Sequence, residues 1–223
     1  MTTKNKKTLF ASLAGILILL VIGGIGCSTM FAEQSKIDRF VAAFGSDVKA
    51  VDKHGWTLLH RAVVPCWGGI EVVQFLVEKG ADVNAKSTTT GWTALLGAVG
   101  NRDIEIIKFL VSKGADVNAA SPQGFTPLQL AVAPDNMEII TFLVSAGANV
   151  NAASACGHTP LHGATAPTFL ADGTILYPDI EIAQFLVSVG ADVNAKNNDG
   201  KTPLDTAREH GHTVAVEFLT GIR

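Results

Sequence analysis

The sequence contains only three cysteines in 223 residues, and this scarcity excludes a small fold built around disulfide bonds. Aromatic residues make up 7% of the chain and charged residues 17%, whereas hydrophobic residues of all kinds make up 48%. Such a composition is typical of a chain that folds around a packed core and excludes a largely disordered protein.

Motifs for common chemistries are also missing. The sequence has no Gly-x-Ser-x-Gly, no His-Glu-x-x-His and no phosphate-binding P-loop. His210 and His212 form a His-x-His pair, but only Glu209 lies at a supporting spacing for a metal ion. We therefore expect no enzymatic activity, no cofactor and no bound metal.

Positive charge is scarce outside the first residues. The net charge is −3, and three lysines lie within residues 1–26, so the remaining 197 residues carry 14 basic and 20 acidic side chains. Nucleic-acid binding needs clustered Lys and Arg, and this balance argues against it.

The first residues have the layout of a secretory signal, which we place at 1–26. Lys4, Lys6 and Lys7 precede an uncharged run of 17 residues, Leu9–Ile25. This run is at the lower limit for a membrane-spanning helix, so an uncleaved anchor is an alternative to cleavage and free secretion. In each case the remainder of the chain is expected outside the cytoplasm, in the periplasm or cell envelope.

The junction Gly24-Ile25-Gly26-Cys27 resembles a bacterial lipoprotein signal, with Cys27 as the lipidated residue. It departs from that pattern at Gly24, where a Leu-like residue is usual. The resemblance implies membrane contact through residues 1–27, followed by a short tether at 27–31.

The remainder of the chain is repetitive. The string Gly-Ala-Asp-Val-Asn-Ala occurs at 80–85, 114–119 and 190–195, with close copies at 45–50 and 147–152. These copies start 35, 34, 33 and 43 residues apart. A second string, Gly-x-Thr-x-Leu, recurs in phase with the first at 55, 91, 124, 157 and 200. A fixed period of this length predicts stacked structural repeats.

Each repeat can be interpreted in physical terms. Thr126-Pro127 reads as an N-cap followed by proline at the first position of a helix. A break such as 101–103 separates this helix type from a second, whose apolar residues have helical spacing. Gly114 is expected to end the second helix, because glycine adopts the left-handed conformation at little cost. Residues 116–119 are expected to run extended into the next turn.

This unit of helix, turn, helix and hairpin resembles the ankyrin repeat. The resemblance implies a mainly α solenoid over residues 32–223, with five stacked repeats and an N-terminal capping helix near Phe31–Phe44. It also implies that His60 and His162 form hydrogen bonds between repeats. The repeats are expected at about 52–84, 88–118, 121–151, 154–194 and 197–223.

The fourth repeat has about ten extra residues near 166–178, where Asp172-Gly173 could form a tight turn between two short apolar arms. This insertion is either a partner-specific hook or a tolerated surface loop that folds back on the helices. For the hook, the binding residues would be Phe169, Leu176 and Tyr177.

Ankyrin domains generally bind proteins in the groove between hairpin tips and first helices. The residue after each turn glycine is expected in that groove, and Trp is enriched among residues that dominate binding energy. Alternatively, these side chains merely cover the next hairpin. The five residues at this position are Trp56, Trp92, Phe125, His158 and Lys201.

The sequence thus predicts a monomeric module that binds a protein partner without chemistry of its own. Two other functions remain open. One is a secreted effector or toxin-neutralising protein that binds a foreign protein, and the other is a periplasmic accessory to an oxidative-stress enzyme.

Overall fold

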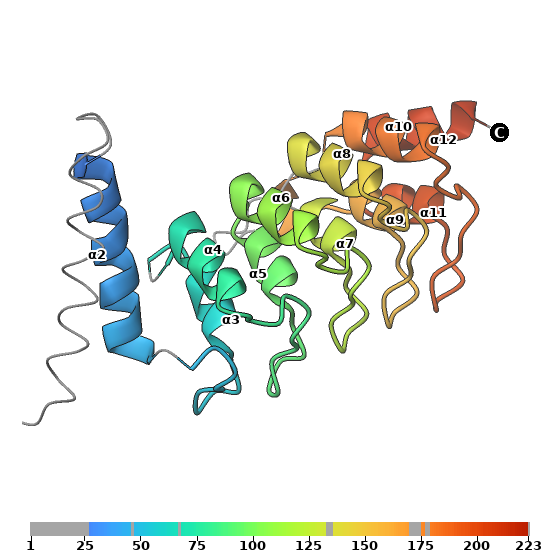
Figure 1. The fold of residues 1–223 in the computed structure, drawn as a ribbon. Coiled ribbons are helices and arrows are strands. Elements are labelled where there is room, and N and C mark those ends of the chain that lie inside the picture. Colours follow the sequence, from blue (N-terminus) through green and yellow to red (C-terminus); the bar gives the residue numbers. More distant parts are fainter. Residues whose placement is uncertain are drawn as a thin grey trace, which may run out of the picture.

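The computed structural model describes residues 27–45, 47–66, 68–132, 136–169, 175–176 and 179–222. A long helix, α2 (Cys27–Phe44), precedes a series of helix pairs (Figure 1). The first helices of the pairs are α3 (Leu58–Ala62), α5 (Ala94–Gly100), α7 (Pro127–Val132), α9 (Pro160–Thr165) and α11 (Pro203–Glu209). The second helices are α4 (Ile70–Glu78), α6 (Ile104–Ser112), α8 (Met137–Ser145), α10 (Ile180–Ser188) and α12 (Thr213–Gly221).

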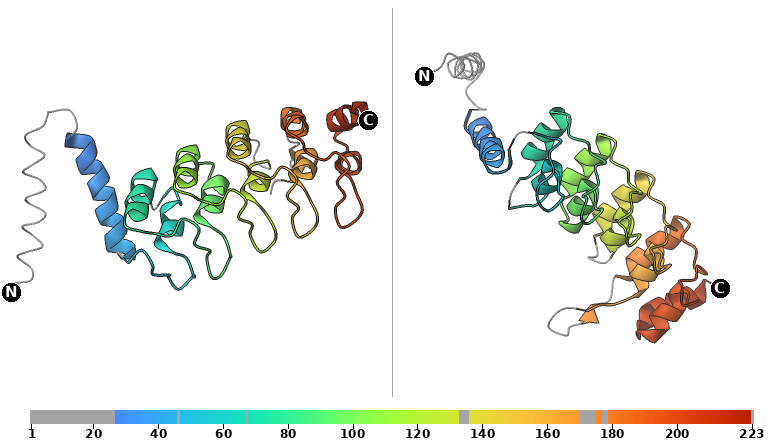
Figure 2. Two further views of the ribbon diagram at one scale, coloured as in Figure 1. Left: turned by 45° about the vertical axis from the view of Figure 1, so that its right-hand side comes forward. Right: turned by 90° about the horizontal axis from the view of Figure 1, so that it is seen from below.

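The pairs stack side by side, so that the first helices form one row and the second helices form another (Figure 2). The loops between successive pairs project from the row of first helices as a series of hairpins, seen at the lower edge of Figure 1. The predicted fold class, a helical solenoid of five stacked units, is confirmed.

The core runs the length of the stack and is built from the same positions in every unit. One leucine in each first helix and one in each second helix is at most 2% exposed. Helices of neighbouring units contact one another along the stack, which is how a single repeat without a core of its own is stabilised. The residues are Leu59, Leu95, Leu128, Leu161, Leu204, Leu76, Leu110, Leu143, Leu186 and Leu219.

Threonine and proline begin the first helices as predicted. Three of these helices start at the proline of a Thr-Pro pair. At Thr126 the hydroxyl accepts a hydrogen bond from the N–H of Gln129 at 3.3 Å, and Thr202 does the same for Asp205 at 3.3 Å. These bonds satisfy backbone groups that a helix leaves open at its start.

Glycine ends the second helices, also as predicted. Gly114 follows α6 with φ +87, a conformation that disfavours any side chain. The next segment differs from the expectation of extended chain. Residues 116–119 form a turn, in which the Ala119 N–H donates to the Asp116 carbonyl at 3.1 Å. The Asp116 carboxylate stabilises this turn by accepting the Asn118 N–H at 2.9 Å.

Helix α2 caps the N-terminal end of the stack, where it packs against α4 (Figure 1). It ends at Phe44, as expected, but it begins at Cys27 rather than near Phe31. Residues 27–31, which were expected to form a short tether, belong to the same helix. Phe40 is only 2% exposed, and its ring lies 5.0 Å from that of Phe44.

The long insertion forms two short antiparallel strands, β1 (Thr168–Phe169) and β2 (Ile175–Leu176). Thr168 pairs with Leu176 and Phe169 with Ile175, so the predicted pair of arms is confirmed. This hairpin extends away from the stack at the junction of α9 and α10 (Figure 2). Asp172, Gly173 and Tyr177 lie outside the described residues.

Residues 1–26, which hold the predicted signal, also lie outside the described residues. Among the helices of the described part of the chain, none combines the length and the apolar character needed to cross a membrane.

Candidate binding surface

A ladder of asparagines joins the outer edges of successive repeats. The Asn118 side chain donates to the Gly147 carbonyl at 3.1 Å and accepts the Asn149 N–H at 2.8 Å. Asn84 and Asn151 make the same two bonds to the repeats that follow them. Each of these bonds joins an asparagine side chain to the backbone of the next repeat. The ladder therefore fixes the spacing of the repeats without depending on the side chains of the repeat that receives the bonds.

A second set of links lies beneath the hairpins, as predicted for His60 and His162. His60 Nδ1 accepts the Thr57 N–H at 3.2 Å, which leaves Nε2–H to donate to the Trp92 carbonyl at 2.8 Å. His162 links Thr159 to the Lys201 carbonyl in the same way, at 3.2 and 3.1 Å. Each imidazole thus spans two repeats as a neutral ring with its proton on Nε2.

Gln129 replaces histidine in the third repeat with the same geometry. Its Oε1 accepts the Thr126 N–H at 2.9 Å, and its Nε2 donates to the His158 carbonyl at 2.7 Å. In the second repeat the position is occupied by Leu96, a buried residue without a polar side chain. The link to the carbonyl of the following hairpin is therefore absent at this junction of the described structure.

Burial lowers the pKa of both linking histidines, because a charged imidazole loses its hydration inside the stack. Protonation would also place a hydrogen on Nδ1, where each ring now accepts a backbone N–H. Neutral His60 and His162 are therefore part of the folded structure.

Trp56 and Trp92 lie together on the hairpin side of the first two repeats. Both are half-buried, and both line a hollow of about 430 Å³ between α3 and α5. The other lining residues are mostly small or apolar. The two tryptophans that we predicted as binding residues therefore share one concave surface. The hollow is also lined by His60, Val63, Val64, Thr90, Thr93, Gly97, Gly100 and Asn101.

A second hollow, of about 460 Å³, adjoins the first and shares Trp56 and Thr90 with it. Its remaining walls are more polar and include Lys53, His54 and Arg61. The indole of Trp56 thus stands between an apolar hollow and a basic one. We call these the apolar hollow and the basic hollow.

Arg61 holds Trp56 in place. Its guanidinium carbon lies 4.8 Å from the centre of the Trp56 ring, within range of a cation–π contact. Asp52 fixes the guanidinium by accepting its Nε–H at 2.7 Å, and it also accepts the Trp56 N–H at 3.0 Å. One side of the indole is therefore covered by a positioned charge.

Asp52 is ionised under all ordinary conditions. Burial alone would raise its pKa, but hydrogen bonds from the Trp56 and His54 N–H groups and from Arg61 outweigh this effect. The pKa of Asp52 falls to about 2. The carboxylate forms an ion pair with Arg61, whereas Lys53 has no ion-pair partner among the residues that the structure describes.

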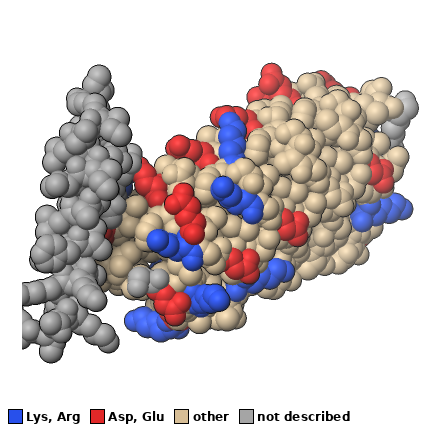
Figure 3. All heavy atoms as spheres, viewed as in Figure 1, with Lys and Arg blue, Asp and Glu red and all other residues tan. Residues whose placement is uncertain are grey.

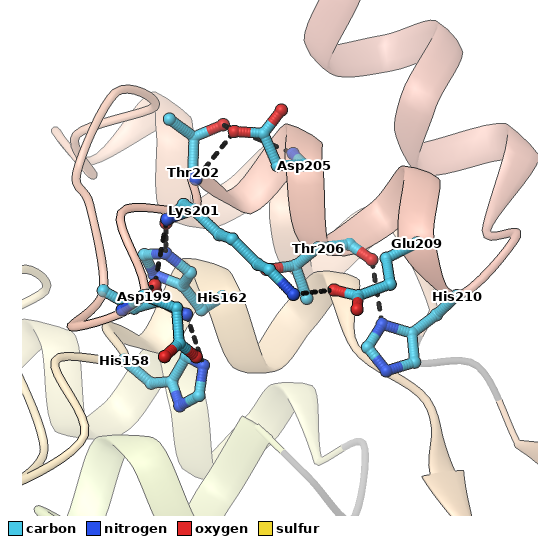
Figure 4. A network of polar contacts seen from close by, with 10 residues as sticks. His158, His162, Asp199, Lys201, Thr202, Asp205, Thr206, Glu209 and His210 are labelled. Carbon is cyan, nitrogen blue, oxygen red and sulfur yellow. Dashed lines mark hydrogen bonds and ion pairs between the residues drawn. The ribbon is translucent and has the colours of Figure 1, made fainter.

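The remaining predicted residues do not join the two tryptophans. Phe125 is 43% exposed. His158 is exposed, and its Nε2 lies 2.9 Å from Asn197 Nδ2. Lys201 donates to Glu209 at 2.6 Å, a hydrogen bond that raises the pKa of the lysine (Figure 4). His158 and Lys201 thus belong to a polar network around α11, away from the tryptophans.

Phe169 and Leu176 lie in the insertion strands, two repeats from Trp92 and three from Trp56, and Tyr177 lies outside the described residues. Cys66 and Cys156 lie three repeats apart, and both are exposed. Each lies in a loop beside a helix rather than on an inward-facing helical position.

Several structural residues of this surface were not identified from the sequence. The asparagine of the repeated string was visible as a recurrence, but its role needed the neighbouring repeat. Arg61 and Asp52 lie nine positions apart and meet only because a hairpin brings the chain back.

The charge pattern of the surface favours no single-sign ligand. Lys and Arg alternate with Asp and Glu over the face shown in Figure 3. Within the described part of the chain, no group of three or more His, Cys, Asp or Glu side chains is arranged to hold a metal ion.

Comparison with known families agrees with this architecture. Residues 66–154 match the family model "Ankyrin repeats (3 copies)", and residues 156–198 match the model "Ankyrin repeat". Together these matches cover more than half of the chain, and neither model describes an enzyme family.

Similar curated proteins include plant potassium channels. The chain is 33% identical over 84 residues to potassium channel AKT1 of Oryza sativa subsp. indica, which is 37% of this chain and 9% of the channel. It is 36% identical over 72 residues to potassium channel AKT1 of Arabidopsis thaliana, or 32% of this chain and 8% of the channel. The chain therefore spans less than a tenth of the length of these relatives.

Proposed function

The chain belongs to the ankyrin-repeat family, and from this premise we propose that it is a non-enzymatic module that binds a protein partner. The observation that carries this proposal is the pairing of Trp56 and Trp92 in one hollow on the hairpin side of the stack. A preformed surface of this kind binds with little loss of conformational freedom. Trp is also the residue type that most often dominates the energy of an interface.

Site-specific crosslinking tests the binding function. A photoreactive phenylalanine analogue at Phe125, which is exposed at the equivalent position of the third repeat, should capture the partner in cells. We expect the combined change Trp56→Ala and Trp92→Ala to reduce capture at least tenfold. Glu105→Ala on the second helix α6 is the matched control and should leave capture unchanged. Equal capture by the double variant and the wild type would contradict a role for the tryptophans.

We further propose that the module is exported and held at a membrane through residues 1–27. The three lysines, the uncharged run Leu9–Ile25 and Cys27 support this proposal. Helix α2 starts at Cys27 and has 18 residues. With a lipid on Cys27, this helix would hold the first repeat within about 27 Å of the bilayer, at 1.5 Å per residue.

Metabolic labelling with a radioactive fatty acid tests the attachment. Label in the wild type but not in Cys27→Ser would support a lipoprotein, and partners would then be sought in the cell envelope. A full-length unlabelled product in the membrane fraction would indicate an uncleaved anchor instead. A shortened, unlabelled product in the medium would favour the alternative of a secreted protein that binds a foreign target.

A further inference from the structure

Helix α5 carries two glycines where a helix former would be more stable. Its sequence, Ala-Leu-Leu-Gly-Ala-Val-Gly, places Gly97 and Gly100 three residues apart, and both line the apolar hollow. Glycine within a helix costs about 1 kcal/mol relative to alanine. Two glycines in a seven-residue helix are therefore a local weakness, and only Gly97 is explained by close packing, since Val63 leaves little room for a Cβ there.

The other first helices show what usually fills these places. Counted from the threonine before each helix, the place of Gly97 is occupied elsewhere by Arg61, Leu130, Gly163 and Thr206. The place of Gly100 is occupied by Val64, Ala133, Ala166 and Glu209. Only the second repeat has glycine at both places. Both glycines line the apolar hollow together with Trp92.

The apolar hollow is large enough to accept one large side chain. Its volume of about 430 Å³ is near the lower end of the range of about 300–1,000 Å³ for ligand pockets. A Cβ at Gly100 would lie 3.9 Å from Trp92 Cζ3, so a side chain there would occupy the hollow without a clash. At Gly97 the room is tighter, with Val63 Cγ2 at 3.1 Å from the position of a Cβ.

The basic hollow indicates which chemical group of a partner should lie beside the side chain that enters the apolar hollow. Lys53 is exposed and forms no ion pair within the described part of the chain, whereas Arg61 is paired with Asp52. A partner with a carboxylate at this point would gain a favourable contact, and one with a cation would be repelled. In an extended segment, side chains two residues apart point to the same side and are about 6.6 Å apart. Trp56 and Thr90 line both hollows, so two such side chains of one segment can face the two hollows on either side of these residues.

We propose that the apolar and basic hollows together form a docking site for an extended segment of the protein partner. An aromatic or large aliphatic side chain of this segment enters the apolar hollow between Trp56 and Trp92. An acidic side chain two residues away contacts Lys53. This inference rests on the proposed protein-binding function and names the partner chemistry of that same surface.

A short peptide tests this site directly. The probe is the peptide acetyl-Glu-Ser-Phe-Ser-Glu-amide, which offers an acid two residues from phenylalanine in either chain direction. It is titrated into the full chain in a non-ionic detergent, and the indole N–H signals of the tryptophans are followed by NMR. We expect the signals of Trp56 and Trp92 to shift. Replacing Phe by Ala should abolish the shifts, and replacing both Glu by Lys should weaken binding at least fivefold.

A variant that fills the apolar hollow gives the most direct test of the docking site. We expect Gly100→Leu to weaken peptide binding at least tenfold, while its urea midpoint stays the same or rises, because leucine favours helix. Gly163→Leu on α9, at the place equivalent to Gly97 but outside the hollow, is the control and should bind as the wild type does. Lys53→Gln should reduce binding of the acidic peptide about fivefold and should strengthen binding of the lysine peptide, because the repulsion from Lys53 is removed.

Several results would overturn the proposal. The first is the absence of shifts with the acidic peptide, and the second is equal peptide binding by Gly100→Leu and the wild type. The third is a larger shift on titration with the fatty acid octanoate than with the peptide. The crosslinking assay separates this inference from the function beneath it. Capture of the partner by Gly100→Leu at the wild-type level would refute the docking site and leave the protein-binding function standing. Failure of the wild type to capture any protein would refute the function itself.

Discussion

His60 Nε2 lies 2.8 Å from the carbonyl oxygen of Trp92, so a single imidazole joins the first repeat to the backbone of a residue that lines the apolar hollow. The ring also contacts the start of its own helix through the Thr57 N–H. Its protonation state therefore affects both the stack and the shape of the hollow.

Acidification should destabilise the stack through these histidines. Burial lowers the pKa of His60 and His162 below the ordinary value of 6.5. As pH falls through 6.5, the unfolded chain takes up protons that the folded chain does not bind. Their contribution to stability is complete above this pH and is lost below it, so urea unfolding should show a lower midpoint at pH 5.5 than at pH 7.5.

The double variant His60→Gln and His162→Gln identifies the cause. Glutamine can make both bonds, as Gln129 does in the third repeat, but it does not titrate. The variant should keep its midpoint more nearly constant between pH 7.5 and pH 5.5. Asp52 does not interfere, because its pKa of about 2 lies well below this range. An unchanged pH dependence in the double variant would exclude the two histidines as the source.

The third repeat allows the reverse experiment. Gln129→Leu removes the acceptor of the Thr126 N–H and the donor to the His158 carbonyl, and should cost about 1–3 kcal/mol. Gln129→His should cost less than about 1 kcal/mol at pH 7.5. It should also make the protein more sensitive to acid, since the new imidazole would be enclosed as His162 is. Urea unfolding of both variants at two pH values checks the pair.

The asparagines of the repeated string should contribute to stability only where their side chains bridge two repeats. Asn118→Ala removes two hydrogen bonds to the next repeat, and the loss should be about 1–2 kcal/mol. Asn194 occupies the same place in the last copy of the string, and its side chain makes no such link within the described residues. Asn194→Ala should therefore change the unfolding free energy by less than about 0.5 kcal/mol. Equal losses of unfolding free energy in the two variants would show that the asparagine stabilises its own turn and not the junction between repeats.

The N-terminal cap should depend on packing rather than on charge. Phe40 is almost fully buried, and Phe40→Ala should cost about 3 kcal/mol. Lys36 and Glu71 form an ion pair at 3.0 Å between α2 and α4, but the lysine is largely exposed. Lys36→Ala should therefore cost less than about 1 kcal/mol. Hydrogen exchange of α2 amides distinguishes local loss of the cap from unfolding of the whole stack.

The period of the sequence was enough to predict the fold. Recurring threonine, proline and leucine specify where each first helix begins and which face is buried, and these signals lie within one repeat. The roles of His60 and His162 followed from the resemblance to known repeats, and their hydrogen bonds confirm them.

The candidate site was predicted only in part. Trp56 and Trp92 occupy equivalent positions, so the stacking of repeats brings them together. The hollow beside them is lined by Gly97 and Gly100, and a missing side chain leaves no pattern of its own. The same holds for residues 116–119, where a local carboxylate contact turned an expected extended segment into a turn.

The links between repeats also bear on how such a chain can change its length. The asparagine ladder and the His60, Gln129 and His162 bonds reach the next repeat through its backbone, not through its side chains. A repeat can therefore accept almost any similar repeat as its neighbour. Duplication or deletion of one whole unit in the gene would preserve these joints, whereas an insertion or deletion of a few residues that shifts the register of the repeats would break several at once.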